Sequence, residues 1–301
     1  MDEVVMHRHA LLLALAEKLC PSLNGTSSYR LAEMVDLGSL EDPGLAGDDA
    51  PWLERGLSSV SSQRLDYWHS ELVRLGSLGV SLVDPRDPGY PANLRMVPDR
   101  PPFLFVRGAI GEDDARAVAV VGARSAGPEG LATAHRLAQE LASRCITVIS
   151  GLAEGVDTAA HTGALSAGGR TIAVFGTGIN TVYPAKNTAL ADNVTNHGAC
   201  VSQFWPDQKG ARWSFPARNI VTSGLSLGTV VVEASETSGA HLQALAALKH
   251  GKRLFLLEHL VSAQRWAREM VGQPGVYPVS SVEEVIVGLE TELTTDASVL
   301  V

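Results

Sequence analysis

Short apolar runs that are rich in β-branched residues recur between residues 117 and 258, and helical segments separate most of them. In the segment 128–142, for example, Leu131, Ala134 and Ala138 fall on one helical face. Strands that are apolar throughout and alternate with helices are typical of a parallel sheet covered on both faces. We therefore predict an α/β fold with a doubly wound, mostly parallel, extended Rossmann-like sheet. The expected strands are 117–121, 146–149, 171–175, 229–233 and 253–257.

The first 116 residues have a different sequence pattern. Leucines in residues 1–35 form one apolar stripe, and a further helix is expected at about 61–75. An acidic linker rich in Gly and Pro separates these two helical segments. Two strand-like pieces, 80–83 and 103–106, flank a region that prolines keep from being helical. We expect a small helical N-terminal domain at 1–75, a lead-in extension at 76–116, a Rossmann-like domain at 117–290 and a tail at 291–301.

The net charge of −9 is distributed unevenly along the 301 residues. Residues 117–258 carry +2, whereas residues 1–116 carry −7 and residues 259–301 carry −4. The acidity therefore lies outside the predicted sheet. The charge of the central segment permits nucleic-acid binding without predicting it.

The three cysteines, Cys20, Cys145 and Cys200, lie far apart in the sequence, without a CxxC spacing. An odd and sparse set of this kind argues against a disulfide framework and against a zinc site. The chain has no run of 18 apolar residues, and its N-terminus carries acids where a signal peptide has basic residues. We expect a soluble cytoplasmic protein that binds no metal and no cofactor and does not contact the membrane.

Polar and glycine-rich clusters follow nearly every predicted strand. In open α/β sheets, ligands bind at the carboxyl ends of the strands, where loops and helix N-termini offer N–H groups to anions. Taken one by one, these clusters are also compatible with tight turns or surface loops. Taken together, they predict a phosphate-binding edge of the sheet. Its candidate residues are Arg124, Ser125, Ser150, Gly151, Gly176, Gly178, Lys186, Asn187, Phe215, Arg218, Asn219, Ser238 and Gly239.

Glu154, Asp157 and His161 are spaced so that they fall on one face of a helix that begins early. This spacing is compatible with a metal site or an acid–base site. The alternative is that Asp157 stabilises the helix N-terminus and that His161 is packed locally. The alternative is favoured because no second pair of ligands is evident.

The order of GARS, SGLAEGVDTAAHTGAL, GRTIAVFGTGINTVYPAKNTAL, FPARN and EASETSGA closely resembles the DprA/Smf family of DNA-processing proteins. The resemblance covers roughly residues 70–290. It implies an extended Rossmann domain that binds single-stranded DNA without sequence preference, forms a homodimer and loads a RecA-type recombinase during natural transformation. By motif position, it places Arg124 and Lys186 near the DNA backbone, together with the FPxRN residues and the SG turn at Ser238 and Gly239.

The sequence departs from the family pattern at several points. Ile220 stands where a second arginine usually follows FPxRN, and Gln203 replaces a usual glutamate. The segment after Gly239 reads AHLQALAAL in place of the usual Thr-Ala pair, and we expect no winged-helix domain after the helix at 282–289. The expected effect of Ile220 is one cation fewer in the pocket and weaker, less salt-dependent binding.

Three functions are compatible with these residues. The first is a non-enzymatic mediator that binds single-stranded DNA. The second is a nucleotide-binding or N-glycosidic-bond-cleaving protein that is similar to the LOG phosphoribohydrolases, in a phage-defence or stress-signalling setting, with Glu233 and Asp157 assisting; the PGGxGTxxE signature of those hydrolases is absent. The third is an interaction scaffold without a ligand.

Overall fold

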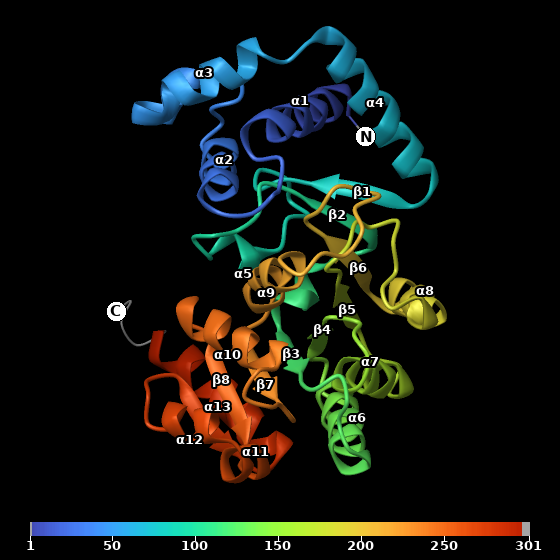
Figure 1. Cartoon of the computed structure of the whole chain (residues 1–301), viewed down its shortest axis with the longest axis vertical. Helices are drawn as coiled ribbons and strands as arrows, with labels where there is room; N and C mark the ends of the chain where they lie inside the picture. Colours follow the sequence, from blue (N-terminus) through green and yellow to red (C-terminus); the bar gives the residue numbers. More distant parts are fainter. Residues whose placement is uncertain (1, 297–301) are drawn as a thin grey trace.

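The computed structural model describes residues 2–296, in which nine strands form one sheet (Figure 1). The strand order is β1-β2-β6-β5-β4-β3-β7-β8-β9. The pairs from β6 through β9 are parallel, and β1 and β2 add an antiparallel edge. The strands are β1 Val80–Val83, β2 Leu104–Gly108, β3 Ala117–Val121, β4 Thr147–Ser150, β5 Thr171–Val174, β6 Ala199–Ser202, β7 Gly228–Val231, β8 Arg253–Leu257 and β9 Val276–Val279.

Helices cover both faces of this sheet, which confirms the predicted doubly wound, mostly parallel α/β class. Alternate residues of β3 point to opposite faces: Val118 packs with α6, α7 and α13, whereas Ala119 packs with α5 and α9. The helices are α1 Glu3–Leu19, α2 Thr26–Asp36, α3 Ala50–Ser58, α4 Ser62–Ser77, α5 Ala92–Arg95, α6 Pro128–Ser143, α7 Val156–Ser166, α8 Thr188–His197, α9 Ser214–Leu225, α10 Gly239–Lys249, α11 Glu258–Ala263, α12 Arg265–Met270 and α13 Val282–Asp296.

Strands β6 and β9 were not predicted. The strand β6 reads ACVS, in which a single β-branched residue gives little strand signal, and β9 contains Pro278. Proline is tolerated in β9 because this strand lies at the edge of the sheet and pairs only with β8. The helix α13 runs to Asp296, so residues 291–296 are helical and not part of a tail; residues 297–301 lie outside the described residues.

Helices α1–α4 lie together at the β1–β2 end of the sheet (Figure 1). Their core is continuous with that of the sheet, since Leu12 and Leu75 belong to the same buried cluster as Phe105 and Phe175. Gln203 contributes to this junction, because its buried side-chain amide donates to the carbonyl of Leu23. The glutamine that departs from the family pattern thus ties β6 to the N-terminal helices.

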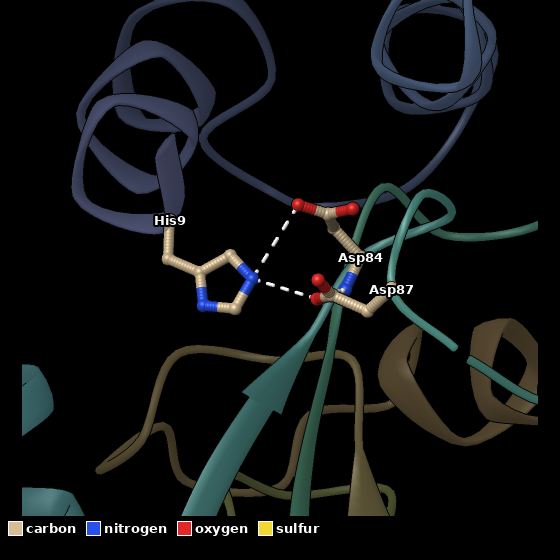
Figure 2. A group of neighbouring side chains, drawn as sticks. All are labelled: His9, Asp84 and Asp87. Atoms are coloured by element: carbon tan, nitrogen blue, oxygen red, sulfur yellow. Dashed lines mark hydrogen bonds and ion pairs between the residues drawn. The ribbon is translucent and has the colours of Figure 1, made fainter. Parts of the chain in front are cut away.

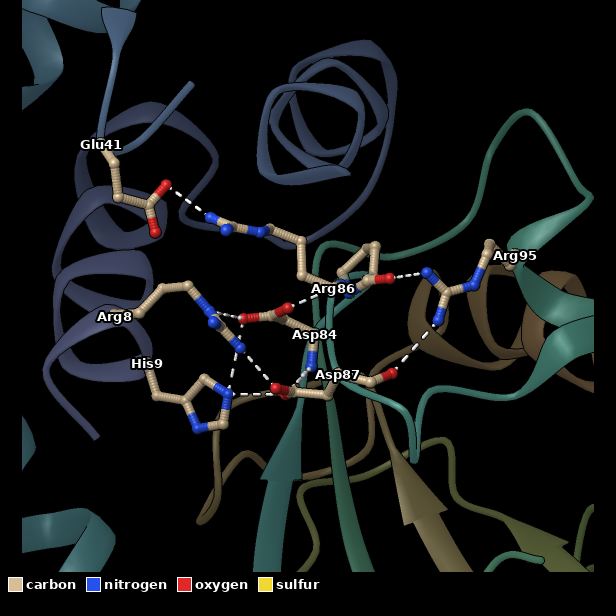
Figure 3. A network of polar contacts seen from close by, with 8 residues as sticks. Arg8, His9, Glu41, Asp84, Arg86, Asp87 and Arg95 are labelled. Atoms are coloured by element: carbon tan, nitrogen blue, oxygen red, sulfur yellow. Dashed lines mark hydrogen bonds and ion pairs between the residues drawn. The ribbon is translucent and has the colours of Figure 1, made fainter. Parts of the chain in front are cut away.

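A buried cluster of charged groups joins α1 to the loop after β1 (Figures 2 and 3). The Nε2 atom of His9 lies 2.7 Å from a carboxylate oxygen of Asp87 and 3.4 Å from one of Asp84. Arg8 donates to both carboxylates, with a distance of 2.7 Å from its Nε atom to Asp84. This spacing of one imidazole and two carboxylates also suits a metal ion. Arg8 already supplies the positive charge there, so the cluster is better described as a clamp between the N-terminal helices and the sheet.

A second carboxylate–histidine contact, at Asp99, holds the part of the β1–β2 segment that lies near β2. Asp99 accepts hydrogen bonds from Lys249 at 2.5 Å and lies 2.6 Å from Nε2 of His250, both at the end of α10. Burial opposes ionisation of Asp99, but the hydrogen bonds from His250 and Lys249 outweigh it and lower the pKa of Asp99 to about 2. The segment between β1 and β2 is therefore fixed to α1 on one side and to α10 on the other.

Among residues 2–296, no helix combines the length and the apolar composition that a membrane crossing requires.

The clamp at His9 makes stability depend on pH. Burial disfavours the imidazolium, but hydrogen bonds to Asp84 and Asp87 outweigh burial and raise the pKa of His9. The stability from this shift is present below the ordinary histidine pKa of about 6.5 and is lost as pH rises through the raised value. The pKa of Asp84 is lowered despite burial, by hydrogen bonds from His9 and Arg8, so its contribution is lost only as pH falls below the ordinary aspartate value of about 3.9.

We predict that His9→Gln lowers the free energy of unfolding by about 3 kcal/mol at pH 5.5, since it leaves buried carboxylates short of a partner. Urea denaturation should show that the difference from the parent narrows towards pH 8.5. The exposed His197→Gln is the control and should change little at either pH. A deficit for His9→Gln that is the same at both pH values would contradict this role of the clamp.

Candidate nucleic-acid interface

A cleft of about 690 Å³ opens at the carboxyl ends of β3, β4 and β7. The chain runs outward from β3 in one direction through β4 and β5, and in the other through β7 and β8, so the cleft lies at the topological switch point of the sheet. Eight of the predicted residues line it: Arg124, Ser125, Gly151, Phe215, Arg218, Asn219, Ser238 and Gly239.

Arg218 forms part of the floor of the cleft. Its guanidinium donates to the carbonyl of Val174 at 2.7 Å and lies directly against Gly151, where a side chain larger than hydrogen would collide with it. Burial lowers the pKa of Arg218, and the charge of Asp157 opposes this effect. Its Nε atom is buried and has no partner among the described residues. Arg218 is therefore a positive charge with an unused buried Nε donor, and it is held by the end of β5 and the turn after β4.

The exposed Arg124 and the half-buried Phe215 form the wall beside this floor. The guanidinium of Arg124 lies 5.2 Å from the centre of the Phe215 ring, and the Tyr183 ring lies 5.7 Å from it. Gly176 contacts the same phenyl ring, and a side chain at position 176 would displace it. An exposed cation over an aromatic face suits a nucleotide unit, since arginine pairs with phosphate and the ring stacks on a base.

Two further cations near Phe215 were missed by the sequence analysis. Lys209 and Arg212 are exposed in the loop before α9, and a side chain at Gly210, between them, would press against the Phe215 ring. The available signal was the presence of two cations directly before the FPARN stretch.

The N-terminus of α6, which follows the turn after β3, is occupied by a side chain. The carboxylate of Glu233 accepts a hydrogen bond from the Gly127 N–H at 3.3 Å, and it packs on Gly130 in the first turn of α6. A glutamate side chain therefore occupies the helix N-terminus, where its negative charge is stabilised by the helix dipole. An incoming phosphate is excluded from this position by like charge.

Five predicted residues lie outside the cleft. Ser150 is buried and donates to the carbonyl of Val120, and Gly178 contacts the backbone of residues 205–206. Gly176 supports Phe215 from behind. Lys186 and Asn187 line a separate, shallower hollow; Lys186 pairs with Glu154 at 3.0 Å, and Asn187 donates to the carbonyl of Leu152 and to Thr158.

Ile220 does not line the cleft, although we expected this position to belong to the pocket. It is half-buried on α9 and is not one of the residues that line the cleft in the described chain. An arginine at this position is therefore not needed to complete the cationic floor that Arg218 provides.

Glu154, Asp157 and His161 do not form a joint site. Glu154 is exposed and pairs with Lys186, whereas Asp157 accepts the N–H groups of Gly151 and Ala153 at 3.2 and 3.3 Å. His161 bonds to the Thr171 hydroxyl at 2.7 Å, and burial together with the charge of Arg218 lowers its pKa to about 3. His161 is packed locally as the alternative predicts, and it is a neutral core residue. Asp157 fixes the turn after β4 by accepting its N–H groups.

The role of Asp157 predicts a large cost for its removal. Asp157→Ala leaves Arg218 without its opposing buried charge and leaves two backbone N–H groups without an acceptor, so we expect a loss of about 3 kcal/mol in the free energy of unfolding. The control Glu154→Ala removes an exposed carboxylate from the same loop and should cost at most about 0.5 kcal/mol. Urea denaturation of both variants tests this, and equal losses would refute the assignment.

Comparisons with known proteins agree with this geometry. Residues 81–289 match the model of the family described as DNA recombination-mediator protein A. The Protein Smf of Escherichia coli is 40% identical over 237 residues, which cover 78% of this chain and 63% of that protein. The DNA processing protein DprA of Streptococcus pneumoniae is 37% identical over 171 residues, which cover 57% of this chain and 60% of that protein. The matched segment thus spans less than two thirds of either relative.

Solved structures extend the similarity to most of the chain. The X-ray structure of DprA from Streptococcus pneumoniae aligns with a TM-score of 0.64 at 25% identity and covers 95% of this chain and 96% of that one. The DNA processing protein A of Helicobacter pylori has the same fold, with a TM-score of 0.61 at 24% identity over 72% of this chain and 96% of that one. With its family-model match across more than half of its residues, this chain belongs to the DNA recombination-mediator protein A family.

Proposed function

We propose that this chain binds single-stranded DNA without sequence preference in the cleft at the β3–β7 switch point. In this role it acts as a non-enzymatic recombination mediator that loads a RecA-type recombinase during DNA uptake in natural transformation. It acts in the cytoplasm, as a homodimer. The observation that carries the proposal is the exposed guanidinium of Arg124 over the Phe215 ring, in the same cleft as the buried cation of Arg218.

The chemistry of this wall matches a single strand better than a duplex. A ring that is accessible from the cleft offers a stacking surface for an unpaired base, and such stacking tolerates every base. Arg124, Lys209 and Arg212 supply exposed positive charge for the backbone beside that ring. The DNA processing protein A of Helicobacter pylori, which has this fold, binds single-stranded DNA, and its binding supports the proposal.

The geometry gives less support to cleavage of an N-glycosidic bond. That reaction needs a carboxyl group free to act on the substrate, and the two candidates are Glu233 and Asp157. Both accept backbone N–H groups, and Asp157 is almost fully buried beside Arg218. Neither is positioned as an available acid or base.

Binding of fluorescent oligo-dT across a salt series tests the proposed function. Arg124→Ala should weaken binding about tenfold and reduce the slope of log K against log salt by about 0.7, because one phosphate contact is lost. Phe215→Ala should weaken binding by about tenfold or more at every salt concentration, since stacking is worth about 1–3 kcal/mol per base. Arg55→Ala, an exposed cation on α3, is the charge-matched control and should bind like the parent.

Arg218 is less suitable for this test, because its removal leaves Asp157 as an uncompensated buried charge. Its variants need a denaturation curve beside each binding curve. A parent protein that fails to bind oligo-dT at low salt would refute the proposed function, as would equal effects of Arg124→Ala and Arg55→Ala.

A further inference from the structure

The α10 side of the cleft contains buried polar groups that have no partner among the described residues. Gln243 of α10 is only 2% exposed, and neither its amide nitrogen nor its carbonyl oxygen has a hydrogen-bond partner among the described residues. The hydroxyl of Ser238, which precedes α10, is likewise buried and unpartnered within the described part of the chain. Both residues line the cleft. Buried polar groups are normally satisfied, so an unpaired carboxamide at the edge of a cleft points to a ligand.

The charges of the cleft indicate which part of a nucleotide reaches this wall. Cations lie on the α9 side, where Arg124 lies over Phe215 and Arg218 forms part of the floor, whereas Ser238 and Gln243 on the α10 side are uncharged. A phosphate is attracted to the first side, and the second side adds no charge that competes for it. The uncharged part of the nucleotide, its base, is therefore the part that suits the wall formed by Ser238 and Gln243.

We propose that Gln243 and Ser238 form a subsite for one base of the bound strand, an inference that rests on the proposed function. The carboxamide of Gln243 offers one donor and one acceptor side by side. Every nucleobase also presents an adjacent donor and acceptor on its edge, and glutamine pairs with bases in this bidentate way. Rotation of the carboxamide exchanges the positions of its N–H donor and its carbonyl acceptor. The subsite therefore favours a nucleotide that carries a base over an abasic one, without preferring any of the four bases.

This assignment predicts opposite effects on stability and on binding. Gln243→Leu removes an unsatisfied buried amide and keeps a side chain of similar size, so we expect a rise in Tm of about 2 °C. The same substitution should weaken oligo-dT binding about tenfold, because the base loses its partner. A residue with a merely structural role would lose stability on substitution.

The probe is a pair of oligonucleotides of equal length, oligo-dT and a strand with abasic spacers, which carry the same phosphates. The parent should bind oligo-dT at least about tenfold more tightly than the abasic strand, and Gln243→Leu should reduce that ratio about fivefold or more while leaving abasic binding unchanged. Gln139→Leu on the exposed face of α6 is the matched control and should change neither the ratio nor binding.

The outcomes separate this inference from the proposed function. A parent that binds neither strand overturns the proposed function, and the base subsite with it. A parent that binds oligo-dT, with a ratio to the abasic strand that Gln243→Leu leaves unchanged, overturns the base subsite alone. A fall in Tm for Gln243→Leu also overturns it, because the amide would then be satisfied within the folded chain.

Discussion

Two buried and opposite charges, Asp157 and Arg218, lie where the carboxyl ends of the central strands meet. Both are almost fully buried, and each is held by backbone groups: Asp157 by the N–H groups after β4, and Arg218 by the carbonyl that ends β5. Glycine at position 151 is required for the guanidinium to approach so closely. Each charge alone would be costly at this depth, so the turn, the helix α9 and the floor of the cleft depend on one another.

The same arrangement gives the cleft its polarity. Arg218 contributes charge from the floor and Arg124 from the rim, and the Phe215 ring beside Arg124 packs against the glycines at 176 and 210. Glu233 occupies the N-terminus of α6, which in other folds of this type is available to phosphate. In the proposed base subsite, the cationic aromatic side and the uncharged polar side would orient a nucleotide with its phosphate towards α9 and its base towards α10.

The sequence was sufficient for the parts of the fold that rest on strong periodicity. Strands β3, β4, β5, β7 and β8 were predicted because each is a short apolar run, and the strand-end location of the site followed from them. The strand β6 was missed because ACVS lacks such a run, and no local pattern reveals that Pro278 lies on an edge. Local sequence also does not reveal which strands are neighbours in the sheet. Lys186 was therefore grouped with Arg124, although it lies in another hollow.

The site residues illustrate the same limit. Arg218 was predicted as a phosphate ligand on its charge, and the structure adds that it is equally a structural cation opposed to Asp157. The N-terminus of α6 is filled by Glu233, which follows β7 and lies more than 100 residues later in the chain, so no local pattern reveals it. Gln243 could not be singled out at all, since its unsatisfied state is a property of its surroundings and not of its neighbours in sequence.

Photocrosslinking tests most directly whether this cleft holds single-stranded DNA. An oligonucleotide substituted with 5-bromodeoxyuridine is irradiated with the full chain, and the crosslinked tryptic peptides are identified by mass spectrometry. We expect crosslinks in the peptide of residues 213–218, which contains Phe215, and their loss with Phe215→Ala. Crosslinks confined to the N-terminal helices, with residues 213–218 unmodified, would contradict binding in this cleft.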